Sequence, residues 1–257
     1  EAYTSYIPSS TSRNEVPDIS LFDHSSLTAA IASCMLDWAR ENGITDFRET
    51  FFRSNTEFRS KEAFLLVHAD LSGIQDFIYT ISSKRALKSL RGRSFYLDLI
   101  LEQIADEILS SLDLCRANLL YSGGGGFYML LPNTQKSAEA LVRAESKVNE
   151  WLYDQFSIRL YLAIGWAPAT ANHFMDPDKV QSSGTREIFR AVSQVVSMKK
   201  TRRYQGMNLE KLFTPEIPQD GVRECSVCGC SKKLYEVQSP DPEEEAILMC
   251  ESCRGLM

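Results

Sequence analysis

Two pairs of cysteines near the carboxyl end constrain this chain more than any other feature. Cys225 and Cys228 form one C-x-x-C pair, Cys250 and Cys253 form a second, and 21 residues separate the pairs. A turn of this spacing presents two sulfur ligands, so two turns complete the tetrahedral shell that zinc prefers. The separation slightly exceeds the usual range of roughly 15 to 20 residues, which indicates a longer loop. Because four protein ligands leave no position for a reacting water, the pattern predicts a structural Zn²⁺ site in a four-cysteine zinc ribbon, with Cys230 as a spare thiol.

The other cysteines and the composition indicate a cytoplasmic protein. Cys34 and Cys115 lie in apolar helical patterns, where we expect buried thiols and no disulfide framework. No apolar run approaches the roughly 18 residues that a membrane helix needs, and no signal peptide is visible. The net charge of −6 excludes a uniformly basic surface. The first residue is Glu1, so we expect a piece of a longer polypeptide.

Strand and helix patterns alternate over the middle of the chain. Buried apolar runs predict four strands, at residues 64–69, 118–121, 127–131 and 158–164. Helical periodicity predicts helices between the first and second strands, and another from a cap at Thr134 to about Phe156. This order predicts an α+β, ferredoxin-like βαββαβ fold of the palm or cyclase type. In that fold an antiparallel sheet carries both helical segments on one face.

The flanking segments complete the predicted organisation. Ser25 or Ser26 offers an N-cap to a packing helix that Gly43 closes, residues 46–61 read as a loop, and a further helix is expected over 186–200. We therefore divide the chain into three parts. These are a linker and helical tail of a preceding domain (1–60), a palm (61–205) and a zinc-binding module (206–257).

One end of the predicted sheet combines a carboxylate with four consecutive glycines. Asp70 ends the first strand and is followed by Ser72 and Gly73, while Gly123, Gly124, Gly125 and Gly126 form the hairpin tip. Glycines let backbone N–H groups approach a phosphate, and a carboxylate can hold a bridging divalent cation. A flexible turn and a helix-capping aspartate explain the same residues equally well. Two-metal chemistry needs at least two carboxylates, so this edge can bind a nucleotide but should not turn one over alone, and it offers no catalytic residue.

Two basic runs stand out against the negative net charge. One places five cations in ten residues and the other four in five: Lys84, Arg85, Lys88, Arg91 and Arg93, then Lys199, Lys200, Arg202 and Arg203. Such clusters can neutralise several RNA phosphates, and Tyr204 is available to stack on a base. An ordinary solvated helix face is the other interpretation of each run.

Several of these motifs occur together, and in the same order, in one known family. They are residues 18–21 (DISL), 23–25 (DHS), 68–78 (HADLSGIQDFI), 90–96 (LRGRSFY), 122–127 (SGGGGF) and the two cysteine pairs. Together they resemble the large subunit of type III-A, Csm-type CRISPR interference complexes. The resemblance covers most of the chain.

The resemblance implies a larger protein with an HD nuclease domain, a first palm, a zinc module, a second palm bearing GGDD and a helical domain. This chain then corresponds to the end of the HD region, a degenerate first palm and the zinc module. The order Asp23-His24 is reversed relative to a catalytic His-Asp dyad, and glycines replace the acids of GGDD.

By the same resemblance, Asp70, Ser72, Gly73 and the tip from Gly123 to Gly126 would line a pocket for ATP with Mg²⁺ or Mn²⁺. The second palm would join ATP into cyclic oligoadenylates when target RNA is bound. The implied partners are guide RNA, target RNA and the other subunits of the ribonucleoprotein. The alternative is a non-catalytic docking platform for RNA and neighbouring subunits, and nucleotide synthesis by this chain alone is disfavoured.

Overall fold

The computed structural model describes residues 3–10, 18–79, 86–175, 184–205, 209–213, 224–230, 233–238 and 246–256. The helical elements are η1 (Thr4–Tyr6), α1 (Leu21–Glu41), the π-helical η2 (Glu49–Arg53), α2 (Asn55–Phe58), α3 (Ile74–Tyr79), α4 (Ala86–Ser111), η3 (Arg116–Asn118), α5 (Gln135–Phe156), η4 (Ser157–Arg159), η5 (Ala171–Phe174), α6 (Gly184–Thr201), α7 (Leu209–Phe213) and α8 (Glu251–Gly255). The strands are β1 (Phe64–Ser72), β2 (Leu119–Gly123), β3 (Gly126–Pro132), β4 (Tyr161–Ala169), β5 (Leu234–Val237) and β6 (Ile247–Cys250). Within these ranges, no helix has the length and apolar character that crossing a bilayer requires.

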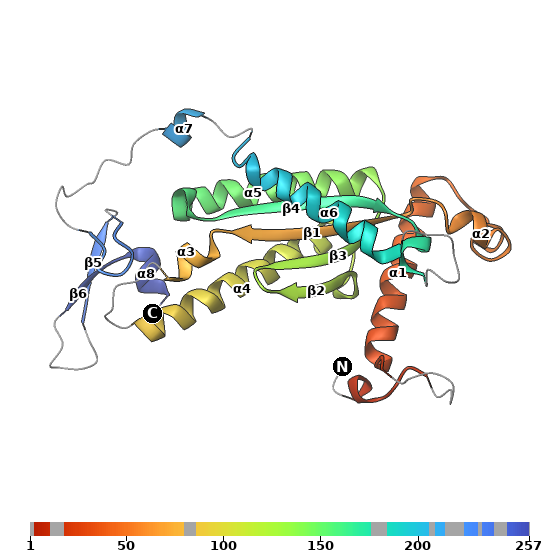
Figure 1. Cartoon of the computed structure of the whole chain (residues 1–257), viewed down its shortest axis with the longest axis horizontal. Helices are drawn as coiled ribbons and strands as arrows, with labels where there is room; N and C mark the ends of the chain where they lie inside the picture. Colours follow the sequence, from red (N-terminus) through yellow and green to blue (C-terminus); the bar gives the residue numbers. More distant parts are fainter. Residues whose placement is uncertain are drawn as a thin grey trace.

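A four-stranded antiparallel sheet organises the larger part of the molecule (Figure 1). The strand order is β2-β3-β1-β4, and β1 pairs with β3 on one side and β4 on the other. Helices α3 and α4 connect β1 to β2, and α5 connects β3 to β4. This topology confirms the predicted ferredoxin-like α+β fold.

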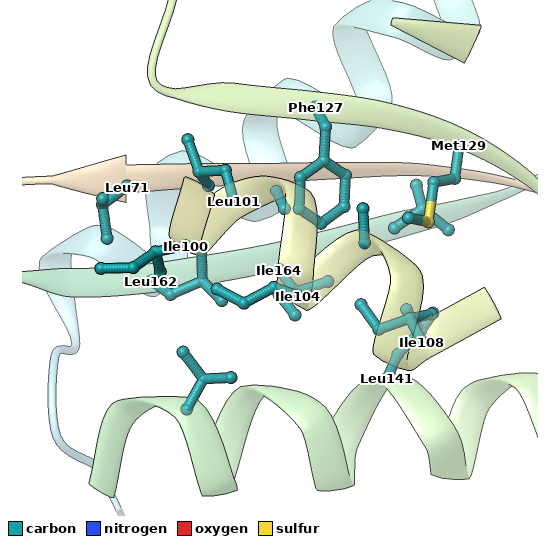
Figure 2. Close-up of a cluster of buried hydrophobic side chains, with 14 of the residues drawn as sticks. Leu71, Ile100, Leu101, Ile104, Ile108, Phe127, Met129, Leu141, Leu162 and Ile164 are labelled. Atoms are coloured by element: carbon teal, nitrogen blue, oxygen red, sulfur yellow. The ribbon is translucent and has the colours of Figure 1, made fainter. Parts of the chain in front are cut away.

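The main hydrophobic core lies between the sheet and the helices α4 and α5 (Figure 2). On β1 it receives the odd-numbered residues Leu65, Val67, Ala69 and Leu71, because successive side chains of a strand point to opposite faces. Leu101, Ile104 and Ile108 of α4 recur at helical spacing and meet the strand side chains, as do Leu141 and Leu152 of α5. Both connections cross on the same side of the sheet, so α4 and α5 bury this face together.

The opposite face of the sheet is also covered, which the sequence pattern alone had left open. Helix α6 packs over β4 and β1, and α1 packs against β3. A second hydrophobic cluster forms there from Phe64 and Leu66 of β1, Cys34 of α1 and Val192 of α6. The central strand is therefore buried on both sides over its first half, which accounts for its nearly continuous apolar run.

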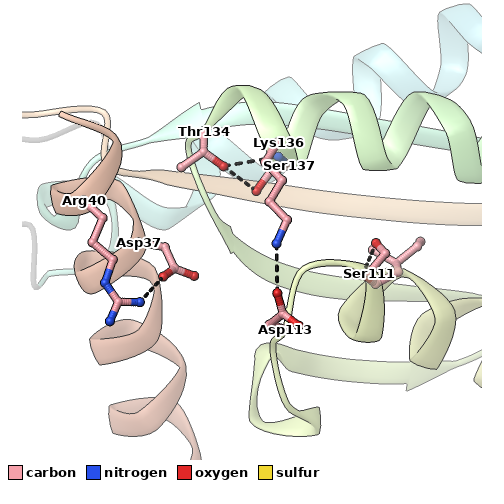
Figure 3. A network of polar contacts seen from close by, with 8 residues as sticks. Asp37, Arg40, Ser111, Asp113, Thr134, Lys136 and Ser137 are labelled. Carbon is pink, nitrogen blue, oxygen red and sulfur yellow. Dashed lines mark hydrogen bonds and ion pairs between the residues drawn. The ribbon is translucent and has the colours of Figure 1, made fainter. Parts of the chain in front are cut away.

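The predicted N-cap residue is correct for α5 and wrong for α1. The Thr134 hydroxyl accepts a hydrogen bond from the Ser137 backbone N–H at 3.2 Å, so Thr134 caps α5 as expected (Figure 3). Helix α1 starts earlier than predicted, because Ser20, not Ser25 or Ser26, accepts from the Asp23 N–H at 3.0 Å. The polar residues 23–26 of α1 interrupt the apolar pattern and hid this earlier start.

Two further expectations were wrong. Residues 46–61 contain η2 and α2 where a loop was expected, and Phe58 is buried against Trp38 and Phe51 in an aromatic cluster. Cys115 is exposed, because α4 ends at Ser111 before the apolar pattern does, whereas Cys34 is buried as predicted.

Candidate functional site

The four paired cysteines converge on one point of the C-terminal module. Their sulfur atoms all lie within 4.8 Å of one another, and Cys228 Sγ lies 3.7 Å from Cys250 Sγ. Zinc–sulfur bonds of about 2.3 Å at tetrahedral angles separate neighbouring sulfurs by about 3.8 Å. The four thiols of Cys225, Cys228, Cys250 and Cys253 therefore fit a zinc ion, and Cys230 is not among them.

Backbone turns hold these thiols in place. Gly229, at φ 68°, donates its N–H to the Cys225 carbonyl at 2.8 Å and so closes the first turn. The second turn joins β6 to α8, where the Cys250 sulfur accepts from the Cys253 N–H at 3.5 Å. The hydrophobic cluster of this module consists largely of the cysteines themselves, with Val227 and Met249. A metal bound by the four thiols would therefore be the main cross-link of a module that has little apolar core.

The close contacts among the four thiols lower the pKa of some and raise the pKa of others. The hydrogen bond with Cys225 lowers the pKa of Cys228, and the same neighbour raises the pKa of Cys250. A bound dication supplies the positive charge that lets all four become thiolates.

The glycine tip and Asp70 lie side by side, as the sequence predicted. Asp70 pairs directly with Gly126 across β1 and β3, and the Leu71 N–H donates to the Gly125 carbonyl at 2.9 Å. Gly124 and Gly125 have φ values of 64° and 89°, the positive values that a two-residue type I′ hairpin turn requires. A methyl group at Gly125 would also overlap the Ile74 side chain of α3.

The Asp70 carboxylate stands in an open part of the sheet and faces a lysine. Its two cross-strand partners are Gly126 and Ala163, neither of which has a side chain larger than a methyl group. Lys200, at the end of α6, places Nζ 2.5 Å from Asp70 Oδ1, and both side chains are about one-third exposed. The arrangement thus joins a carboxylate, an ammonium group and the glycine tip.

The neighbours of Asp70 on the same face of β1 are polar as well. His68 stacks on Tyr128 with ring centroids 4.2 Å apart, and burial lowers the pKa of its imidazole. Ser72 is buried, and its hydroxyl has no hydrogen-bond partner within the described residues. Gly73 has φ 93°, and a side chain there would overlap the Arg159 carbonyl, so this glycine has a packing role.

The two basic runs do not form two uniform cationic surfaces. Lys84 and Arg85 lie outside the described residues, and Lys88 lies in α4 with an undescribed side chain. Arg91 is exposed, but Arg93 is only 2% exposed, which removes it from any RNA-facing surface. The sequence had no local sign of this burial.

The second run is likewise divided among different partners. Lys199 Nζ donates to Glu145 and to the Ile164 carbonyl, each at 2.6 Å, and lies 4.6 Å from the Trp166 ring centroid. Lys200 pairs with Asp70, whereas Arg202 and Arg203 are exposed. Lys199 therefore stabilises the contact between α5, β4 and α6.

Comparison with known proteins places these features in one family. The family described as Csm1 subunit domain B matches residues 63–218. Relatives named Cas10/Csm1 of subtype III-A, a single-strand-specific deoxyribonuclease, are 43% identical in Mycobacterium tuberculosis and 42% identical in Enterococcus italicus. Both alignments cover 100% of this chain but only 32% of the relative, so the chain spans about a third of the length of these proteins.

Solved structures agree with this assignment. A Csm1–Csm4 cassette in complex with one ATP has a TM-score of 0.67 at 35% identity, covering 83% of this chain and 27% of the other. A cassette in complex with cA3 has a TM-score of 0.67 at 31% identity, covering 96% of this chain and 32% of the other. Fold, sequence and the converging cysteines thus agree, and the chain belongs to the Csm1 family, the large subunits of type III-A CRISPR complexes.

Proposed function

We propose that this chain supplies one half of an ATP pocket in the large subunit of an RNA-guided type III-A effector. Residues 61–205 would form a degenerate palm, 206–257 a zinc-binding module, and 1–60 the tail of a preceding HD-type domain. The observation that carries the proposal is the contact of three chemical groups at one sheet edge. Asp70 pairs with Gly126 of the glycine tip and binds Lys200 at 2.5 Å.

Each of these groups has a specific use toward a triphosphate. Backbone N–H groups of a glycine turn reach phosphate oxygens without steric hindrance, and an ammonium group neutralises their charge. Asp70 can hold Lys200 in position before the nucleotide arrives and can accept Mg²⁺ or Mn²⁺ once Lys200 turns to a phosphate. The tip residues 123–126 include no carboxylate. The second acid that two-metal chemistry needs would come from a second, GGDD-bearing palm, where cyclic oligoadenylates would form.

Structures of the relatives support this assignment of ligands. Similar cassettes have been solved with one ATP, with cA4, with cA3 and with pppApA. All of them are complexes of Csm1 with Csm4, which makes a Csm4-type subunit the expected neighbour of this chain. Guide and target RNA are further proposed partners, and Arg91, Arg202 and Arg203 are the exposed cations among the described side chains of the two runs.

Binding of ATP to the full-length protein, measured by titration calorimetry with and without Mg²⁺, tests the proposal. We expect Asp70→Ala and Lys200→Met each to weaken binding roughly 10-fold or more, since a hydrogen bond to a charged group contributes about 1.5–3 kcal/mol. The matched control is Asp113→Ala, which removes a carboxylate from an exposed pair with Lys136 on another part of the surface. The control should bind ATP normally.

The opposite result would favour the docking platform. If Asp70→Ala, Lys200→Met and the control Asp113→Ala all bind ATP with the parent affinity, ATP does not bind at this edge. Oligoadenylate synthesis by residues 1–257 alone would contradict the need for a second palm.

A further inference from the structure

The first turns of α4 lie against the zinc module (Figure 1). A methyl group at Gly92 would overlap the backbone carbonyl of Leu256, which follows α8. The Leu256 side chain packs against the main core of the palm. Gly92 therefore has a steric reason to be glycine, because any side chain there would push the module away from the palm.

The next residue of α4 crosses the same boundary. Arg93 is among the largest fully buried side chains of the described residues, at 2% exposure. Its Nη1 donates to the Phe77 carbonyl of α3 at 2.5 Å, and its Nη2 donates to Cys253 Sγ at 3.2 Å. The guanidinium carbon also lies 5.1 Å from the centroid of the Phe77 ring. One guanidinium thus bridges a zinc-ligand sulfur and the palm.

From this geometry we propose that Arg93 is an outer-sphere partner of the zinc centre and that it fastens the zinc module to the palm. A zinc ion with four thiolates keeps a net charge of −2, and a buried guanidinium needs an anion nearby. Each therefore stabilises the other. Groups that hydrogen-bond to metal ligands orient those ligands and strengthen metal binding. Arg93 is a positioning residue in this role.

A second arginine connects the palm to the other cysteine turn. Arg159 Nη2 donates to the Cys228 carbonyl at 3.4 Å, and the Arg159 carbonyl lies against Gly73. Arg93 reaches Cys253 of the second turn and Phe77 of α3, while Arg159 reaches Cys228 of the first turn. Both connections lead back to the segment that follows β1. The zinc module thereby braces α3 and the turn before it.

Zinc retention in the full-length protein tests the first half of the inference. We expect Arg93→Met to weaken zinc binding roughly 10- to 100-fold, the usual effect of losing an outer-shell partner, as measured by transfer to a chromogenic chelator. Arg91→Met is the matched control, since it removes the same charge from an exposed position of the same helix. Equal zinc affinity of the two variants would overturn the inference.

Hydrogen exchange tests the docking half and does not involve ATP, so its outcome is independent of the nucleotide proposal. Removal of zinc, or Arg93→Met, should speed amide exchange over 74–79 and 250–256 while the strands of the palm stay protected. Gly92→Ala keeps every charge and should produce the same exchange pattern through steric displacement. If Arg93→Met does not fold, Gly92→Ala decides the question. Unchanged exchange over 74–79 in Gly92→Ala and after zinc removal would overturn the docking.

Discussion

The two faces of β1 differ in chemistry toward the hairpin tip, since one stays apolar and the other becomes polar. Odd-numbered residues from Leu65 to Leu71 all enter the main core. The even-numbered residues face the other side of the sheet. Phe64 and Leu66 are buried there in the second hydrophobic cluster, but His68, Asp70 and Ser72 toward the hairpin tip are polar. Buried polar groups destabilise a fold unless they are paired, and the buried Ser72 hydroxyl has no partner within the described residues, so this polar end of one face is where a ligand site is expected.

The largest contrast should come from neighbouring residues on opposite faces. We expect Leu71→Ala to destabilise the palm by about 2–5 kcal/mol, because Leu71 is 3% exposed and its loss leaves a cavity in the main core. The measurement is the free energy of opening of the β1 amides, from hydrogen exchange of the full-length protein. A loss below about 1 kcal/mol would show that this face is not the stabilising one.

The stability of the palm should vary with pH because of His68, which lies on the polar face of β1. Burial lowers the pKa of His68, so the neutral ring is favoured in the folded state. The contribution of His68 is therefore present above its unfolded pKa of about 6.5 and is lost as the pH falls through the lower folded value.

Replacing His68 by Phe keeps an aromatic ring against Tyr128 and removes the titration. The variant should lose less stability than the parent between pH 7 and pH 5, in the same exchange measurement. His24→Phe, at an exposed position of α1, is the control and should leave the pH profile unchanged. Identical profiles for His68→Phe and the parent would contradict a destabilising protonation on this face.

The smallest expected effect is that of Ser72→Ala. The Ser72 hydroxyl is buried without a hydrogen-bond partner within the described residues, so its removal costs no interaction there. We expect a change within about 0.5 kcal/mol, or a slight gain in stability, in the opening free energy of β1. A loss above about 1 kcal/mol would show that this hydroxyl has a partner within the protein, and it would argue against Ser72 as a ligand-binding residue.

Much of the fold could be predicted because its determinants are local. Alternating and continuous apolar runs placed the four palm strands, Thr134 placed the start of α5, and the hairpin followed from the glycine tip. The covering of the second face could not be predicted. It depends on α1 and α6, which precede β1 and follow β4 in the sequence and come together only when the sheet has formed.

In the candidate sites too, local features could be predicted and long-range contacts could not. The cysteine spacing predicted four converging sulfurs, and the strand order predicted Asp70 beside Gly126, since both follow from short-range geometry. The roles of the basic residues could not be predicted. Lys200 and Asp70 are 130 residues apart in the sequence, and Arg93 and Cys253 are 160 apart. A run of like charges does not indicate such distant partners.

A structure of the full-length protein with ATP and Mg²⁺ bound tests the central claim most directly. We predict triphosphate oxygens within hydrogen-bond distance of the Gly124 and Gly125 backbone N–H groups, with Lys200 turned from Asp70 toward a phosphate. The claim would be contradicted by ATP bound elsewhere while the Asp70–Lys200 pair remains closed and the glycine tip touches no part of the nucleotide.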